Sequence, residues 1–199
     1  MLVFWKERLV YLATPKTGTT AIESALESLA SVVIQRPPEL KHTAAFRYWK
    51  HLAPFLTAAA DEDFLVVAVM REPLDWLGSW YRYRQREGML RQDASTAGIS
   101  FNTFVEAYLS DPQPAYAAVG RQANFLRPPN SPGVDRIFPY DDIGRFVGFL
   151  EDRLDCEITL PRLNVSPEVP VDLAPDVEAR LRLALQEDFD LYASLDRTG

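Results

Sequence analysis

The sequence contains little cysteine and no long apolar run. Its single cysteine, Cys156, excludes an intrachain disulfide and a cysteine-based zinc site, and it is compatible with a reducing cytoplasm. The longest apolar stretch, residues 64–70, is much too short to span a bilayer. The N-terminal stretch MLVFWKERLV lacks the basic-then-apolar pattern of an export signal. We therefore expect a cytoplasmic protein without a membrane anchor.

The chain also has fewer basic than acidic residues. The chain carries 21 lysines and arginines against 28 aspartates and glutamates, which gives a net charge of −7. Such a surface repels the phosphate backbones of nucleic acids except at a local basic patch, so we expect no nucleic-acid partner. With 199 residues, of which 47% are hydrophobic and 12% aromatic, the chain is large enough to bury one substantial core. Residues 1–199 are therefore predicted to form a single domain.

Strand and helix patterns alternate along the chain. Apolar runs typical of buried strands are followed by stretches whose apolar residues recur at helical spacing. This alternation predicts a single-domain, P-loop-like three-layer α/β fold with a mainly parallel central sheet flanked by helices, in which ligands bind at the carboxyl ends of the strands. The predicted strands are residues 9–13, 31–35, 64–70 and 134–138, and the predicted helices are residues 20–30, 44–56, 73–85, 101–109, 116–126, 143–150 and about 174–195, the last packing on the core.

The segment LVYLATPKTGTT, residues 9–20, predicts a strand, an anion-binding loop and the first turn of a helix. Backbone N–H groups at a helix N-terminus lack partners, and the helix dipole favours a negative charge there. Lys16 adds a positive charge and Gly18 lets the backbone approach a ligand closely. The order Lys-Thr-Gly differs from the Walker A pattern, in which lysine follows the second glycine. A phosphate or sulfate group fits this loop, and three hydroxyl groups are available to donate to it, those of Thr17, Thr19 and Thr20.

A second cation follows the strongest strand pattern, residues 64–70. Arg71 stands where an NTPase usually places an acidic Mg²⁺ ligand, so the sequence favours an anionic ligand handled without a metal. Since Lys16 and Arg71 both follow predicted strands, we expect one anion site with two lobes. The alternative for Arg71 is an ion pair with Glu72, Asp75 or another acid.

These residues carry a family resemblance. TPKTGTT, together with VVAVMREPLDWLGSWYRYR, resembles the two motifs of the PAPS-dependent sulfotransferases, particularly the short bacterial enzymes akin to the carbohydrate type. The resemblance implies that Pro15 to Thr20 hold the 5′-phosphosulfate of 3′-phosphoadenosine-5′-phosphosulfate (PAPS), and that Arg71 and Ser79 hold its 3′-phosphate. Weaker similarity continues through FVEAYL, GRQANFL and LPRLNVSP. In the last of these, Asn164 and Ser166 would close over the nucleotide, with a simple asparagine-serine turn as the alternative.

The resemblance implies transfer of a sulfuryl group from PAPS to a hydroxyl or amine, with 3′-phosphoadenosine-5′-phosphate (PAP) as product and no metal. We hypothesise that Lys16 stabilises the charge that develops on the bridging oxygen. The acceptor must lose a proton, and His42 is the first candidate base because it follows the second predicted strand, at the same sheet end as Lys16. Glu39 is the reserve, because some sulfotransferases use a glutamate. A loop role beside Thr43, the predicted cap of the next helix, is the alternative for His42.

Two other functions remain open. An ATP-dependent kinase on a P-loop-like fold would depend on Mg²⁺, and a non-catalytic nucleotide-binding module would keep the loop but lack a base. The acceptor is expected to be a small molecule or a carbohydrate. At this chain length its pocket is either open or completed by a second subunit, which would make the protein a homodimer.

Several segments have two interpretations. Residues 86–99 are expected to form a surface loop or a lid. The cluster from Trp80 to Arg84, with Arg86, either binds the acceptor or divides its aromatic side chains between core and surface. Ser79 also suits simple packing inside a helix. The acidic residues near the C-terminus are expected to form a solvated helix face: Glu187, Asp188 and Asp190.

Overall fold

The computed structural model describes residues 1–86, 92–161 and 169–195. In this part of the chain a mixed, mostly parallel sheet of five strands lies at the centre, in the order β3-β1-β2-β4-β5. β2 pairs in parallel with β4, and β4 in parallel with β5, whereas β1 runs antiparallel to both of its neighbours. The strands are β1 (Leu2–Phe4), β2 (Leu9–Leu12), β3 (Val32–Val33), β4 (Leu65–Met70) and β5 (Arg136–Pro139).

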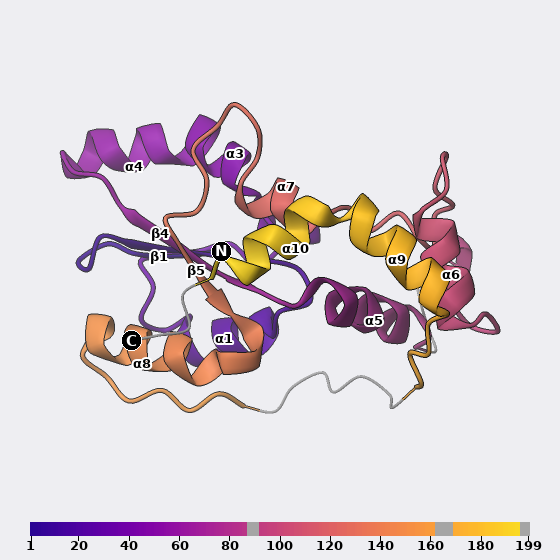
Figure 1. Cartoon of the computed structure of the whole chain (residues 1–199). Coiled ribbons are helices and arrows are strands. Elements are labelled where there is room, and N and C mark those ends of the chain that lie inside the picture. The colour runs from indigo at the N-terminus through magenta and orange to yellow at the C-terminus, as the bar shows by residue number, and fades with distance from the viewer. Residues whose placement is uncertain (87–91, 162–168, 196–199) are drawn as a thin grey trace.

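Helices cover both faces of the sheet (Figure 1). α1 and α8 lie on one face, α3 and α4 lie on the other, and α5, α6 and α9 form a group beyond one end of the strands. The predicted α/β class and the helix-flanked, mostly parallel sheet are therefore confirmed. The helices are α1 (Thr19–Leu26), α2 (Pro38–Lys41), α3 (Ala45–Arg47), the π-helical segment η1 (Tyr48–Leu52), α4 (Ala53–Ala60), α5 (Pro73–Arg84), the 3₁₀ turns η2 (Gln92–Ala94) and η3 (Tyr140–Asp142), α6 (Phe101–Tyr108), α7 (Gln122–Leu126), α8 (Ile143–Leu154), α9 (Pro175–Ala184) and α10 (Gln186–Ala193).

β4 is buried on both faces, as its unbroken apolar sequence predicts. Successive side chains of a strand point to opposite faces, so Val67 and Val69 pack with α1 and α8. Val66, Ala68 and Met70 pack on the other face, in the cluster that includes Tyr48 and Leu56. A third cluster joins α5, α6 and α9 around residues such as Phe104.

The N-terminal hairpin was not predicted from the sequence. Instead of running directly into the strand at residue 9, the chain first forms β1, which pairs with β2 in the register Leu2↔Tyr11 and Phe4↔Leu9. The turn between the two strands contains Arg8 in the left-handed region, with φ of 49°. This hairpin adds an antiparallel strand, β1, to the mostly parallel sheet of the described residues.

The region between β3 and β4 is more helical than predicted. The predicted loop at residues 39–43 contains α2, which begins at Pro38, where the fixed φ of proline suits a first helical turn. The predicted helix at 44–56 continues to Ala60 through α3, η1 and α4. Thr43 does not cap it, because the N-cap position is Ala44; the Thr43 hydroxyl donates to the Leu40 carbonyl at 2.6 Å.

Three of the predicted helices are shorter than expected. The helix expected at 20–30 ends at Leu26. The helix expected at 116–126 is confined to α7, because Gly120 lies in the left-handed region with φ of 76°. The helix expected at 174–195 breaks at Leu185 into α9 and α10. By contrast, α5 matches its prediction, and α6 begins at the predicted cap, since the Ser100 hydroxyl accepts from the Thr103 N–H at 3.1 Å.

Asp188 is not part of a solvated helix face. Its side chain is 2% exposed, and its carboxylate accepts from the Arg121 Nε and the Ala123 N–H, each at 3.0 Å. Because α10 packs on α7, this carboxylate lies inside the fold. Glu187 and Asp190 are exposed, as expected. No helix of the described residues is long and apolar enough to cross a bilayer.

Phe146 holds α8 on the sheet. Its ring is fully buried and lies 5.4 Å from the Tyr11 ring and 5.1 Å from the Phe138 ring, centroid to centroid. Phe146→Ala is expected to lower the free energy of unfolding by about 3–5 kcal/mol, because it removes the buried ring and leaves a cavity. Urea unfolding of this variant beside Phe55→Ala, a position 72% exposed, measures the effect. Similar losses in both variants would contradict a core role for Phe146.

Candidate functional site

The loop from Pro15 to Thr20 joins the end of β2 to the start of α1. Gly18 precedes the helix in the left-handed region, with φ of 73° and ψ of 15°. A Cβ on this glycine would lie 3.3 Å from Cε2 of Tyr140, so a side chain here would be both strained and crowded. Lys16 also has a positive φ, of 67°. The loop therefore depends on two left-handed residues, of which only one is glycine.

Hydrogen bonds from neighbouring side chains hold the loop in this shape. The Thr17 hydroxyl is buried and donates to the Thr14 carbonyl at 2.9 Å, and the Trp76 indole N–H donates to the Pro15 carbonyl at 2.9 Å. Thr17 is thus used within the loop and not as a free donor. The N–H groups of Thr19 and Thr20 lie in the first turn of α1, where the helix dipole favours an anion.

Lys16 lies against aromatic rings of α5. Its Nζ is 3.9 Å from the centroid of the Tyr83 ring and 5.5 Å from that of Trp80, both cation–π distances. Burial, together with the smaller effects of the nearby Arg86 and Arg71, lowers the pKa of the Lys16 ammonium to about 7. An anion beside Lys16 would oppose each of these effects.

Arg71 stands directly after β4 and contacts the loop. Its Nη1 donates to the Lys16 carbonyl at 3.3 Å, and its guanidinium lies 4.6 Å from the Tyr140 ring centroid. The other two guanidinium nitrogens donate to Asp75, with Nη2 3.0 Å from Oδ1. The structure thus brings Arg71 to the loop, and it also contains the ion pair with Asp75 that was the alternative.

Gln122 fixes the backbone of Arg71. The Gln122 side chain is 1% exposed, its Nε2 donates to the Arg71 carbonyl at 2.8 Å, and its Oε1 accepts from the Arg71 N–H at 3.0 Å. Both backbone polar groups of Arg71 are thereby satisfied where β4 ends. Sequence reasoning missed this residue, although it lies in the segment GRQANFL.

His42 contacts the segment between β2 and the loop. Its Nδ1 lies 2.7 Å from the Ala13 carbonyl oxygen. Because a carbonyl only accepts, Nδ1 carries the proton and Nε2 is left as the acceptor of a neutral ring. Burial lowers the pKa of His42 from its ordinary value, which also favours the neutral form. A neutral histidine with an accepting nitrogen is suited to remove a proton.

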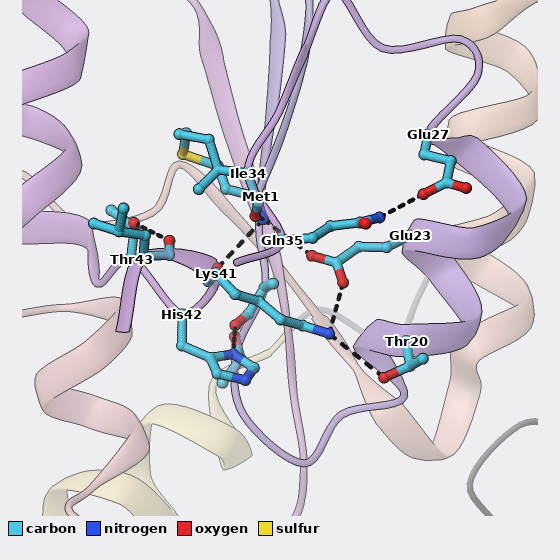
Figure 2. Close-up of polar contacts among 12 residues, drawn as sticks. Met1, Thr20, Glu23, Glu27, Ile34, Gln35, Lys41, His42 and Thr43 are labelled. Carbon is cyan, nitrogen blue, oxygen red and sulfur yellow. Dashed lines mark hydrogen bonds and ion pairs between the residues drawn. The ribbon is translucent and has the colours of Figure 1, made fainter. Parts of the chain in front are cut away.

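A buried charge cluster lies beside His42 (Figure 2). The Glu23 side chain is 2% exposed, and its carboxylate pairs with the Lys41 Nζ at 2.8 Å and with the Met1 ammonium at 3.0 Å. Lys41 Nζ also lies 3.5 Å from the hydroxyl oxygen of Thr20. Sequence reasoning identified neither Glu23 nor Lys41. Together, Lys41 and His42 hold α2 against both ends of the loop.

For the remaining predicted site residues, the described part of the chain gives no hydrogen bond to the loop. Glu39 is exposed on α2, and Ser79 is buried on α5 with 6% of its side chain exposed. Asn164 and Ser166 lie outside the described residues. In residues 1–86, 92–161 and 169–195, no group of three or more His, Cys, Asp or Glu side chains is arranged to hold a metal ion.

The structure describes the whole aromatic cluster but only part of the predicted lid. Residues 87–91 lie outside the described part, but residues 92–99 are tied to α5, since the fully buried Thr96 donates its hydroxyl to the Tyr81 carbonyl at 2.7 Å. Tyr81 belongs to the core, whereas Trp80 and Tyr83 are half-buried beside Lys16. The aromatic side chains are therefore divided between the core and the site.

A shallow groove of about 640 Å³ lies between η1, α7 and the loop before β5. Its walls are largely aromatic and proline side chains, which do not suit a small anion, and none of the predicted site residues lines it. We therefore place the candidate site at the loop and Arg71. The groove is lined by Phe46, Trp49, Lys50, Asn124, Pro128, Pro129, Asn130, Ser131 and Pro132.

The pKa of Lys16 can be measured directly. After reductive methylation with ¹³C-formaldehyde, which keeps the charge, we expect one lysine of the four in the chain to titrate near pH 7 by NMR. Its charged form is therefore populated below pH 7 and lost above it. The signal should be missing in Lys16→Arg and present in the control Lys6→Arg. Ordinary titration of all four lysines above pH 9 would contradict the burial of Lys16.

Comparisons with known proteins assign no family to this chain. No protein-family model matches it, no curated protein matches it, and no solved structure matches it. A functional interpretation therefore has to come from the residues and geometry of the site.

Proposed function

We propose that the protein is a PAPS-dependent sulfotransferase on a P-loop-like α/β fold. The observation that carries the proposal is the contact between the loop and Arg71, whose Nη1 lies 3.3 Å from the Lys16 carbonyl oxygen. This contact joins an anion-binding loop at a helix N-terminus to a guanidinium group at the end of the next parallel strand. Two adjacent cationic lobes suit a ligand that has anionic groups at two ends.

The two lobes differ in chemistry. The loop offers backbone N–H groups and the Lys16 ammonium, which suit the 5′-phosphosulfate. Arg71 offers a planar fork of donors, which suits a terminal phosphate such as the 3′-phosphate of PAPS. Gln122 supports this assignment, because it fixes the backbone from which the fork extends.

In the proposed reaction the acceptor oxygen or nitrogen attacks the sulfur in line with the bridging oxygen. A bond forms between sulfur and the acceptor, and the bond between sulfur and the bridging oxygen breaks, leaving its electron pair on the 5′-phosphate of PAP. The acceptor proton passes to a base. Lys16 stabilises the charge that develops on the bridging oxygen, in place of the metal ion that phosphoryl transfer commonly uses.

His42 is the base that the site supports best. Its ring is neutral, its Nδ1 is held by the Ala13 carbonyl, and its Nε2 accepts a proton. Glu39 is the second hypothesis, but it is exposed on α2 and has no comparable link to the loop among the described contacts. The acceptor is a small molecule or a carbohydrate.

Calorimetry with the product analogue 3′,5′-ADP tests the ligand class. We expect binding that is unchanged by EDTA, because the site uses cations of the protein. Arg71→Ala should weaken binding by about 10- to 100-fold, since it removes charge-assisted hydrogen bonds worth roughly 1.5–3 kcal/mol. The control Arg47→Ala, at an exposed position of α3, should bind normally. Binding of ATP only in the presence of Mg²⁺ would instead support a kinase.

The pH dependence of turnover tests the two catalytic roles. We expect kcat/KM to rise with pH through the lowered pKa of His42, below 6.5, and to fall above about pH 7 as Lys16 loses its proton. The optimum therefore lies between the lowered pKa of His42 and that of Lys16. Lys16→Ala should lower kcat by roughly 100-fold or more, as loss of a transition-state contact does.

Two variants separate the candidate bases. His42→Asn keeps a donor for the Ala13 carbonyl but has no titratable nitrogen, so it should remove the acidic limb of the profile. Glu39→Gln should leave the profile unchanged. An unchanged profile in His42→Asn would reject His42 as the base, and binding of 3′,5′-ADP without any turnover would favour the nucleotide-binding module.

A further inference from the structure

Asp75 occupies the Nε and Nη2 edge of Arg71, at which an anion could accept two parallel hydrogen bonds. The two oxygens of its carboxylate accept from Nε and Nη2 of Arg71 in a two-pronged pair. The third nitrogen, Nη1, donates to the Lys16 carbonyl. All three guanidinium nitrogens therefore have a partner before any ligand arrives.

The position of Asp75 is set by the start of α5. Pro73 opens the helix, and the Glu72 side chain accepts from the Asp75 N–H at 2.8 Å. Asp75 thus stands in the first turn, where the helix dipole favours its negative charge, and four residues after Arg71, which is the spacing of a helical side-chain pair. Its side chain is 47% exposed, whereas that of Arg71 is 17% exposed.

Arg71 has little freedom to turn toward other acceptors. Gln122 holds its backbone, and the Tyr140 ring lies 4.6 Å from its guanidinium. An anion that takes two parallel hydrogen bonds from the Nε and Nη2 edge of Arg71 has to displace Asp75. Asp75, being the more exposed partner, is the group that can move into solvent.

We propose that Asp75 is a specificity-determining residue that competes with the terminal phosphate of the ligand for Arg71. This inference rests on the proposed function, since the ligand it concerns is the nucleotide with a 3′-phosphate. A phosphate monoester carries close to two negative charges at neutral pH and three acceptor oxygens, whereas the carboxylate carries one charge and two oxygens. A doubly charged phosphate therefore displaces Asp75, and a singly charged group does not. The same competition favours release of the product, because the Asp75 carboxylate pairs again with Nε and Nη2 of Arg71 when the phosphate leaves.

The test compares two nucleotides in the whole protein and in Asp75→Asn, which keeps the side-chain shape and removes the charge. We expect Asp75→Asn to bind 3′,5′-ADP about 3- to 10-fold more tightly, mostly through slower dissociation, as the loss of a partly exposed ion-pair competitor suggests. Binding of 5′-AMP, which carries no group for Arg71, should be unchanged. Asp75→Ser, which also lacks the charge, should act in the same direction. Stopped-flow dissociation and calorimetry supply the two readouts.

The matched control is Glu72→Gln. It removes one negative charge from the adjacent turn, and its amide oxygen can still accept from the Asp75 N–H, so the Arg71–Asp75 pair stays intact. Equal tightening in Glu72→Gln, or equal tightening for 5′-AMP, would mean a general charge effect and would overturn the inference. Weaker binding of 3′,5′-ADP by Asp75→Asn would mean that Asp75 positions Arg71 and would also overturn it.

The two proposals fail in different ways. A wild-type protein that prefers 3′,5′-ADP over 5′-AMP, together with an Asp75→Asn variant that shows no gain, rejects the role of Asp75 and leaves the sulfotransferase proposal intact. A wild-type protein that does not discriminate between the two nucleotides rejects the 3′-phosphate lobe, and with it both proposals.

Discussion

The parallel pairing of β2 with β4 is the interaction on which the site depends. Its register, Leu12↔Ala68, brings the ends of the two strands to one edge of the sheet, so the loop after β2 and Arg71 start from neighbouring points. A shift of one residue would turn every side chain of β4 to the other face. Because β4 is buried on both sides, such a shift would misplace Val67 and its neighbours in two cores at once. The packing of the sheet thereby fixes where Arg71 begins.

The parts of the fold that could be predicted are those with a strong local signal. β4 is an unbroken apolar run, α5 begins with a proline, and α6 follows a serine that caps it. β1 has only three residues, too few to show a period, and its pairing depends on β2 and β3. The break at Leu185 has no glycine or proline to mark it. Asp188 was misjudged because its burial comes from a partner 67 residues away, Arg121.

The same distinction applies to the site. Lys16, Gly18 and Arg71 stand in short motifs whose chemistry can be inferred from residue type and order. Gln122 cannot be found in this way, because its partners are the backbone atoms of a residue 51 positions away, and backbone groups are alike in every sequence. Glu23 is equally hidden, since in a helix a glutamate is usually a solvated residue. Its burial follows from the approach of two cations from other segments.

The cations of this site differ in how strongly each interacts with its neighbours. Lys41 is paired with a carboxylate that is 2% exposed, and removing one member of a buried pair costs several kcal/mol, so Lys41 has a structural role. Lys16 rests on uncharged aromatic faces, and Arg71 on a half-exposed carboxylate, contacts worth roughly 0–2 kcal/mol each. A charge-assisted bond to a phosphate is stronger than the aromatic contact of Lys16, and a doubly charged phosphate attracts Arg71 more strongly than a half-exposed carboxylate with one charge does. Lys16 and Arg71 are therefore held in position without being fully neutralised, which is the arrangement that a site for a doubly anionic ligand requires.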